Sequence, residues 1–460
     1  MATERKNGNE SNDNDADGNS FCVLWLKMND AAHWIRRVSG SNEERADRMG
    51  TSMFDRIKLA EISNSDLANA VRKAKQLTSG SYSDYERNEK TLSRLLSKIM
   101  ELSRKEGEWY LYFNALYFRF YLAYRADDDK AIIKYAEVYY RDSALYMDKE
   151  LPNYPNTDMA RFNAWICGYI LGVYENYSEI DDAKMDSFMK RYEEVVLKYG
   201  QTYSFYQDEM ELAALYRDEA MMEHGRKNFE KYENEIESCY ICGHIQYFTY
   251  YIMKDKLEKA EELLLDYINR NIPKKHLWCY KYCERAETQS LYAQILRDAR
   301  KLGKPDIFRY FYEKYWLSQP GDCQRGTKED WYYNLSIYLS AIAGNFDALE
   351  ADCAEAQEDI DNMSTYSTVS RINTGLEWYC YFVLLDKSGC REVHIRLPES
   401  DGEQEQGGSC ASLAVSRYME RIADENGRKF SQARAKYDYT FTKEAFLQCA
   451  GLAEEEPQAK

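Results

Sequence analysis

The sequence predicts an all-α protein, organised as an α-solenoid of helix–turn–helix repeats with helical N- and C-terminal caps. Residues that interrupt helices are scarce, because only 7 of the 460 residues are Pro and 22 are Gly. Hydrophobic residues make up 44% of the chain and charged residues 30%, which is the balance of a globular protein. Helical patterns also alternate with short turns roughly every 35 to 50 residues, the repeat length of solenoids.

The chain begins with a polar, acidic segment over residues 1–20, which we expect to be a disordered tail. Residues 21–104 follow as an N-terminal helical cap. Within this cap, the stretch SNSDLANAVRKAKQL places Leu67 and Val71 on one helical face and offers Ser65 as the residue that caps the helix start.

Residues 105–390 are predicted to form the repeat array. The first pair of helices is WYLYFNALYFRFYLAYR followed by DDDKAIIKYAEVYYRDSALYM, and further pairs follow at similar spacing. A unit of two helices cannot bury its own apolar face, so neighbouring units must stack. Stacking creates a concave surface lined by the first helix of each unit, and such surfaces serve for binding.

One unit, residues 244–273, has suitable residues at five packing positions: Phe248, Tyr251, Leu257, Ala260 and Leu264. Pro273 lies one place after the position of the terminating proline. With these residues the unit resembles a tetratricopeptide repeat. It departs from that pattern at Tyr267, which replaces a small residue, and at Asp255, which replaces the turn glycine. A second stretch, GNFDALEADCAEA, fits the same pattern at Gly344, Phe346 and Ala356. The resemblance implies a tetratricopeptide-like fold and little about activity.

Residues 391–410 interrupt the helical pattern as a short strand and a polar linker. REVHIRLP alternates Val393, Ile395 and Leu397 in the manner of a strand, and the Gly-rich stretch ESDGEQEQGGS follows it.

Helical spacing returns in residues 411–451, which we expect to cap the end of the array. Thr442 is the expected cap at the start of its last helix, and Gly451 is the expected helix stop. Residues 452–460 are predicted to be a second disordered tail.

Charge and cysteine content limit the surroundings of the protein. The net charge of −17 repels phosphate groups, so we expect neither nucleic acid nor a membrane surface as a partner. No stretch reaches the roughly 20 apolar residues of a membrane span, and no signal-peptide core is visible. The 12 cysteines are scattered along the chain, which is typical of reduced thiols in the cytoplasm.

Tyrosine is unusually frequent, with 41 residues beside 17 Phe and 8 Trp. Its ring is apolar and rigid and its tip is polar, which suits both packing between helices and contact with a ligand. Packing is the simplest role for each single Tyr, but the set also predicts a ligand-binding groove. The candidate groove residues, chosen from predicted first helices, are Tyr117, Tyr121, Tyr169, Tyr206, Tyr247 and Tyr251.

Two groups of Cys and His have spacings that suggest metal ligands: Cys239-x-x-Cys242-x-His244 and His276-x-x-Cys279-x-x-x-Cys283. Each group lies near the start of a predicted first helix, and first helices of successive repeats are neighbours. Four of these side chains could therefore converge on a tetrahedral zinc site. The spacing matches no standard zinc finger, and buried Cys packs as a small hydrophobic residue. The sequence favours buried thiols with no metal and no cofactor, and it leaves zinc as the alternative.

Catalytic motifs are absent from the sequence, which has no Gly-rich phosphate loop, no H-E-x-x-H and no G-x-S-x-G. We therefore expect no enzyme and nominate no catalytic residue. The predicted function is that of a scaffold that binds a protein or peptide on its Tyr-rich concave surface. Because the protein is acidic, the partner should be neutral to basic, with apolar anchors for the tyrosines.

Two alternatives remain open. The first is a cytosolic regulator that responds to a peptide, since intracellular receptors for bacterial signalling peptides have a similar repeat architecture. A regulator of transcription would also need a DNA-binding head, and residues 29–80 lack both the clear turn and the basic surface of one. The second alternative is an enzyme without a recognisable motif.

Overall fold

The computed structural model describes residues 59–77, 82–125, 128–146, 156–236, 239–328, 330–398 and 410–453. Both predicted tails, apart from residues 452 and 453, lie outside these residues, as do residues 21–58 of the N-terminal cap and residues 399–409 of the linker. Helices make up most of the described chain, which confirms the all-α prediction. Among the described residues, no helix combines the length and the apolar character that crossing a membrane requires.

The first helices in chain order are α4 (Ser65–Leu77), α5 (Tyr82–Glu106), α6 (Trp109–Arg125), α7 (Asp129–Tyr146), α8 (Asn156–Tyr174), α9 (Asp182–Tyr199), α10 (Thr202–Tyr216) and α11 (Glu219–Tyr232). The central helices are α12 (Tyr240–His244), α13 (Gln246–Met253), α14 (Leu257–Ile268), α15 (Cys279–Tyr282), α16 (Thr288–Lys301), α17 (Pro305–Phe311) and α18 (Gly321–Gln324). The C-terminal elements are α19 (Tyr333–Ile342), α20 (Leu349–Asn362), α21 (Thr368–Lys387), β1 (Glu392–Val393), β2 (Cys410–Ala411), α22 (Ser412–Ala433) and α23 (Tyr439–Cys449).

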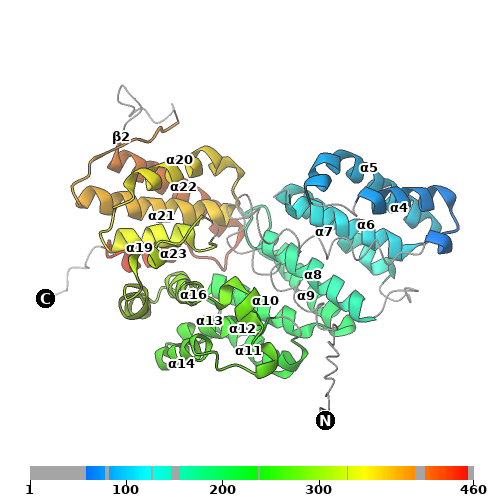
Figure 1. The fold of residues 1–460 in the computed structure, drawn as a ribbon, viewed down its shortest axis with the longest axis horizontal. Coiled ribbons are helices and arrows are strands. Elements are labelled where there is room, and N and C mark those ends of the chain that lie inside the picture. Colours follow the sequence, from blue (N-terminus) through cyan, green and yellow to red (C-terminus); the bar gives the residue numbers. More distant parts are fainter. Residues whose placement is uncertain are drawn as a thin grey trace, which may run out of the picture.

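Helices that follow one another in the chain pack as pairs, because each is apolar on the side that faces its neighbour. The pairs include α6 with α7, α8 with α9, α10 with α11, α13 with α14 and α16 with α17. The first helices of successive pairs also touch, since α8 contacts α10, α10 contacts α13, α13 contacts α16 and α16 contacts α19. In Figure 1, α4 to α7 form one end of the molecule, and α19 to α23 lie at the other.

The unit with the tetratricopeptide-like residues folds as two helices, α13 and α14, joined by a tight turn. Phe248, Ala260 and Leu264 are fully buried in this unit. Asp255, which stands where the pattern has glycine, adopts a positive φ of 53°. Asp tolerates this left-handed conformation better than most residues with a side chain. Tyr267 is accommodated as well, because its ring packs edge-on against Phe248 with 5.7 Å between the ring centroids.

Two predicted helix caps are each misplaced by a few residues. At the start of α4, Asn64 rather than Ser65 caps the helix, since its side chain accepts hydrogen bonds from the backbone N–H groups of residues 66 and 67 at 3.0 Å. At the start of α23, Asp438 caps the helix and Thr442 lies inside it. Asn and Asp are at least as effective as Ser and Thr at the N-cap position, which fits the capping by Asn64 and Asp438. The predicted stop at Gly451 is confirmed by its φ of 67°.

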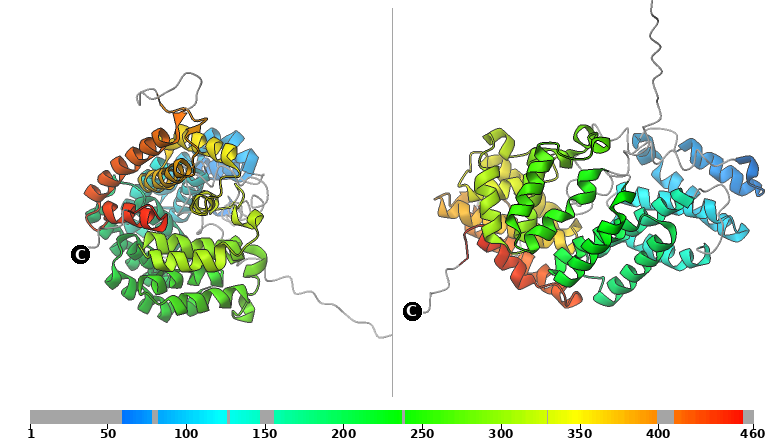
Figure 2. Two further views of the ribbon diagram at one scale, coloured as in Figure 1. Left: turned by 90° about the vertical axis from the view of Figure 1, so that its left-hand side faces the viewer. Right: turned by 90° about the horizontal axis from the view of Figure 1, so that it is seen from below.

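The C-terminal helices fold back onto the end of α8. The backbone N–H of Val369 donates to the carbonyl of Asn176 over 3.1 Å, and the backbone N–H of Ser178 donates to the Thr368 hydroxyl over 3.1 Å. Arg434, at the end of α22, is fully buried and donates to the carbonyl of Tyr174. In the left view of Figure 2, the orange helices lie at the top and the green helices at the bottom, with the red helix between them. Helix α23 contacts α16 and α17, so parts of the chain that are distant in sequence pack together.

The predicted strand is confirmed in a short form, since Glu392–Val393 pairs antiparallel with Cys410–Ala411. Val393, Ile395 and Leu397 are buried, as their alternation predicts. They join a hydrophobic cluster with residues of α19 to α22, so residues on both sides of the predicted boundary near 390 share one core. Helices α21 and α22 cross closely at Gly375, where a Cβ atom would lie 2.9 Å from the carbonyl oxygen of Met419.

Candidate functional site

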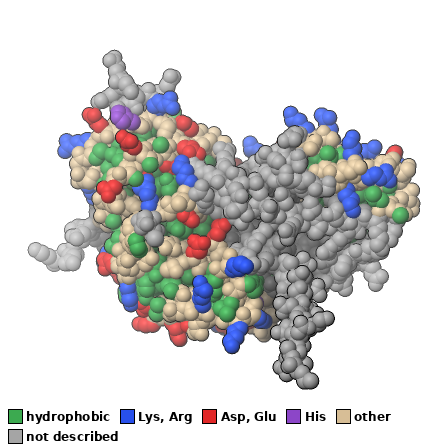
Figure 3. All heavy atoms as spheres, in the orientation of Figure 1, with side chains coloured by type: hydrophobic (Ala, Val, Ile, Leu, Met, Phe, Trp, Pro, Cys, Tyr) green, Lys and Arg blue, Asp and Glu red, His purple; other side chains and the backbone are tan. Residues whose placement is uncertain are grey.

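A charged cavity of about 160 Å³ lies where the C-terminal helices meet α8, α10 and α16. Its charged lining residues are Glu175, Glu211, Arg217, Arg297, Arg300, Lys301, Lys328, Asp330, Glu355 and Glu377. Burying a charge is unfavourable unless the charge is paired, so such a concentration of acids and bases at one interior site calls for an explanation. Figure 3 shows acidic and basic side chains interspersed on the described surface of the face in view, so both signs of charge occur outside as well.

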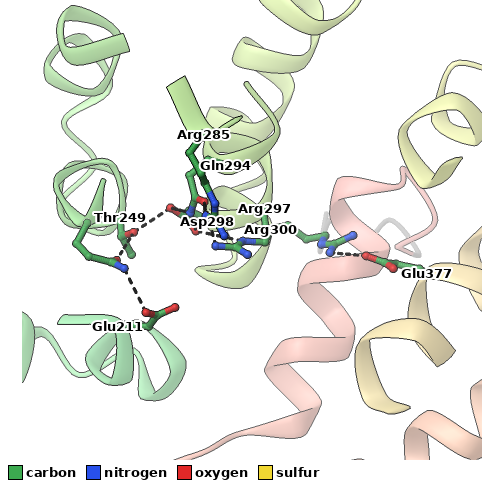
Figure 4. Close-up of polar contacts among 9 residues, drawn as sticks. Glu211, Thr249, Arg285, Gln294, Arg297, Asp298, Arg300 and Glu377 are labelled. Carbon is green, nitrogen blue, oxygen red and sulfur yellow. Dashed lines mark hydrogen bonds and ion pairs between the residues drawn. The ribbon is translucent and has the colours of Figure 1, made fainter. Parts of the chain in front are cut away.

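Helix α16 supplies most of the polar network beside the cavity (Figure 4). Asp298 is buried and accepts hydrogen bonds from Thr249 Oγ1 at 2.8 Å and from Gln294 Nε2 at 2.9 Å. Gln294 in turn accepts from Arg285 at 2.6 Å and from Arg297 at 3.0 Å. These bonds satisfy a row of buried polar groups and hold two guanidinium groups in fixed positions.

The guanidinium groups are also held by aromatic rings. Arg285 lies 4.4 Å and Arg297 lies 5.0 Å from the ring of Trp331, so both arginines contact the same indole. Arg300 lies 4.0 Å from the ring of Phe446 on α23. A planar guanidinium stacks well on an aromatic face and is weakly hydrated, which makes arginine the cation best suited to such an interior.

Arg300 connects α16 to α21. Its Nη2 atom donates to Glu377 Oε1 over 2.7 Å, and both side chains are largely buried. Burial by itself lowers the pKa of Arg300, but the charge and hydrogen bond of Glu377 together with the nearby Tyr338 raise it by more, so the pKa lies above its usual value. Its other terminal nitrogen, Nη1, is buried and has no hydrogen-bond partner. One buried N–H donor group therefore remains available at a site that lines the cavity.

Glu175, which directly follows α8, is a buried acidic residue at the same cavity. It is 7% exposed, and no described residue forms a hydrogen bond with its carboxyl group. Burial, and secondarily the neighbouring carboxylate of Glu211, raise the pKa of Glu175 to about 8. Glu175 is therefore mostly protonated at neutral pH, when its carboxyl group both donates and accepts hydrogen bonds.

Two side-chain amides are also among the polar groups that line the cavity. Asn334 on α19 and Asn373 on α21 both reach it, and neither amide forms a side-chain hydrogen bond within the described part of the chain. An amide offers a donor and an acceptor together. The cavity thus presents several matched donors and acceptors that the protein itself leaves unused.

The tyrosines predicted to line a groove are placed differently from that prediction. Tyr117, Tyr169 and Tyr206 are only 4%, 2% and 5% exposed, so they are core residues and offer no ring face to a ligand. Tyr247 and Tyr251 are partly buried and stack on each other at 6.1 Å. The side chain of Tyr121 lies outside the described residues. These rings pack between helices and are not free for a ligand, because burying each ring removes a large apolar area from water.

The predicted cysteine and histidine groups separate in the structure. The four cysteines are buried near one another, whereas both imidazoles lie against Tyr240, with ring centroids 4.0 Å away for His244 and 5.2 Å away for His276. The stacking on Tyr240 explains the placement of the histidines without a metal.

The polar residues of α16 were missed by sequence reasoning. The signal was present, since Ser290, Gln294 and Asp298 recur at helical spacing and mark one face of the helix. A polar face on a helix normally indicates solvent, and only the packing of α13, α19 and α23 around α16 shows that this face is buried.

Comparison of the chain with protein-family models, with curated proteins and with solved structures gave no significant match.

Proposed function

We propose that the protein binds a peptide or a protein segment, and that the end of this ligand or one of its side chains enters the charged cavity. The observation that carries the proposal is the set of unused hydrogen-bonding groups: the Glu175 carboxyl, Arg300 Nη1 and the amides of Asn334 and Asn373. Arg300 and Glu175 are buried, and buried polar groups normally have partners, which a ligand would supply.

The chemistry of these groups favours a peptide. A peptide group carries one donor and one acceptor, which matches the donor and acceptor of an Asn amide. Arg300 suits a carboxylate or a carbonyl oxygen, because a guanidinium binds either in its plane. The net charge of −17 attracts a neutral to basic ligand, as expected from the sequence.

The size of the cavity limits what enters it. A volume of 160 Å³ is close to that of an engineered cavity that holds one benzene molecule, roughly 150 Å³. One side chain or one chain end fits such a space. The rest of a peptide would lie outside it, along the helices around the entrance.

The fold is consistent with this role. We propose that the stacked pairs α8–α9, α10–α11, α13–α14 and α16–α17 form a tetratricopeptide-like solenoid, closed by α19 to α23. In this arrangement the first helices face the interior, so their polar residues line the cavity and their tyrosines fill the spaces between helices.

Selection from a library of displayed short peptides, followed by calorimetry with the selected peptides, tests the proposal. The double variant Asn334→Ala with Asn373→Ala should bind a selected peptide at least about tenfold more weakly, which corresponds to about 1.4 kcal/mol. Asn228→Ala is the matched control, because Asn228 on α11 is also partly buried and does not line the cavity. Its affinity should equal that of the unchanged protein.

Equal binding by the double variant and the unchanged protein would show that the peptides bind elsewhere. A selection that yields no specific binder would count against peptide binding altogether. Circular dichroism of each variant establishes that a loss of binding does not come from unfolding.

A second candidate function, a regulator that responds to a peptide, has one observation in its favour. The cavity is walled by α8 and α10 on one side and by α19, α21 and α23 on the other, and the hydrogen bond from Val369 to Asn176 joins these distant parts. A ligand that contacts both walls would favour one relative position of them. Small-angle scattering with and without a selected peptide separates this function from a passive scaffold, which would show no change.

A further inference from the structure

Four cysteines come together at two short turns of the array. Cys239 and Cys242 stand at the start of α12, and Cys279 and Cys283 stand at the two ends of α15. Their exposed fractions are 0%, 2%, 0% and 8%. The two turns are far apart in sequence and adjacent in space, so the cluster is a product of the tertiary structure.

Three of the four sulfur atoms are close enough to share one ion, and the fourth, that of Cys279, is next to one of these three. The Sγ atoms of Cys239, Cys242 and Cys283 all lie within 4.8 Å of one another, and those of Cys242 and Cys283 are 3.2 Å apart. The thiol of Cys279 interacts directly with that of Cys239. In a tetrahedral zinc site with Zn–S bonds of about 2.3 Å, neighbouring sulfur atoms lie about 3.8 Å apart. The Cys242–Cys283 separation of 3.2 Å is somewhat shorter than this value, and no pair among Cys239, Cys242 and Cys283 is more than 4.8 Å apart.

The backbone around the cluster is well fixed. The N–H of Tyr240 donates to Cys279 Sγ over 3.3 Å, which links one turn to a thiol of the other. The carbonyl of Cys242 accepts from Gln207 Nε2 at 2.8 Å, and the N–H of Cys283 donates to the carbonyl of Cys279 at 2.8 Å. Hydrogen bonds therefore hold in place both turns that carry the thiols.

Simple packing explains single buried cysteines better than it explains this group. Cys167, Cys380 and Cys449 are buried elsewhere in the described chain. Within that chain, the Cys239, Cys242 and Cys283 group is the one set of metal-ligating side chains whose donor atoms converge. Hydrophobic packing explains why each cysteine is buried. It does not explain why two pairs of thiols from two separate turns lie next to one another.

We propose that Cys239, Cys242, Cys279 and Cys283 bind one Zn²⁺ as a structural site that joins the turn before α13 to the turn before α16. Four thiolates leave no open coordination position, so the site stabilises the fold and performs no catalysis. Each thiol loses its proton to the solvent when the metal binds. Arg285 follows Cys283 by two residues, so the metal would also stabilise the turn that presents this arginine to Gln294.

Elemental analysis of the full-length protein, purified without chelator and without a metal-affinity step, tests the site. The expected result is one zinc per chain, lost in the double variant Cys242→Ser with Cys283→Ser and retained in Cys449→Ser. Cys449 is a suitable control because it is 8% exposed, as Cys283 is, and lies outside the cluster. Metal-free protein as purified, which takes up no stoichiometric zinc when Zn²⁺ is added, would overturn the proposal.

A second measurement needs no variant and so does not depend on whether the variant folds. Cobalt(II) added to protein stripped of metal should produce the charge-transfer absorption of thiolate ligands and the visible bands of tetrahedral cobalt. In the zinc-loaded protein, peptide mapping after alkylation should show these four cysteines protected, and a chelator should make them reactive. Equal alkylation with and without chelator, or a disulfide between Cys242 and Cys283 in freshly purified protein, would reject the zinc site.

Discussion

Helices α6 and α16 are both first helices of a pair and both are deeply buried, yet they are buried in opposite ways. In α6 the buried residues are mainly aromatic and aliphatic, among them Tyr117, Phe118 and Phe120. In α16 aliphatic residues share the interior with Gln294, Asp298 and Arg300, each at most 5% exposed. Helix α6 is held by apolar contacts, whereas α16 is held partly by hydrogen bonds and ion pairs.

The difference teaches where function should be sought in a helical array. Apolar and aromatic burial is what any core requires, so an abundance of tyrosine carries little functional information. Buried charge is costly and must be paired, and it is therefore the more informative feature. Arg300 Nη1, which has no hydrogen-bond partner, and the buried carboxyl group of Glu175 both lie at the cavity.

The largest effect should come from the aromatic core of α6. Tyr117→Ala removes a ring that is 4% exposed, and the free energy of unfolding should fall by roughly 4 kcal/mol, as for other large aromatic truncations. Urea denaturation measures the change. Tyr251→Ala is the comparison, because its ring is only partly buried and its loss should cost roughly 1 kcal/mol. Similar values for both would contradict the assignment of Tyr117 to the core.

The ion pair of α16 and α21 should show strong coupling. Glu377→Leu leaves the guanidinium of Arg300 buried without its carboxylate, and we expect the free energy of unfolding to fall by roughly 3 kcal/mol. Adding Arg300→Met removes the unpaired charge, so the double variant should recover most of that loss. A double-mutant cycle by urea denaturation measures the coupling. Strictly additive effects would mean that the pair does not contribute to holding α16 against α21.

The smallest expected change in the free energy of unfolding concerns Glu175. This change is distinctive because it depends on pH. Its pKa is raised by burial from 4.5 to about 8, so the folded protein binds this proton more tightly than the unfolded chain. The contribution of Glu175 to stability is therefore fully present below about pH 4.5 and is lost as the pH rises toward 8. The slope is at most about 1.4 kcal/mol per pH unit.

Glu175→Gln removes this titration. Relative to the unchanged protein, the variant should gain roughly 2 kcal/mol of stability between pH 5 and pH 8, measured by urea denaturation at each pH. Glu179→Gln is the control, since Glu179 is an exposed carboxylate four residues further on. Its profile should run parallel to that of the unchanged protein. A parallel profile for Glu175→Gln would show that Glu175 does not titrate in this window.

Several local features were predictable from the sequence. The scarcity of Pro and Gly and the helical spacing predicted an all-α protein, and the alternation of Val393, Ile395 and Leu397 predicted their burial beside a short strand. The turn between α13 and α14 was predictable even though Asp255 replaces glycine, because the neighbouring packing residues remain. These features depend on periods of a few residues, which the backbone geometry dictates directly.

The candidate sites were decided by the tertiary structure. The sequence by itself determined which residues form helices and which side of each helix is apolar, and it supplied the four cysteines in two spaced pairs. Whether the polar face of α16 meets water or other helices depends on contacts with α13, α19 and α23. Whether the cysteine pairs meet depends on how two turns far apart in the chain are stacked. Local periodicity carries no information about such distant contacts, because burial is a property of what packs against a surface and not of the surface alone.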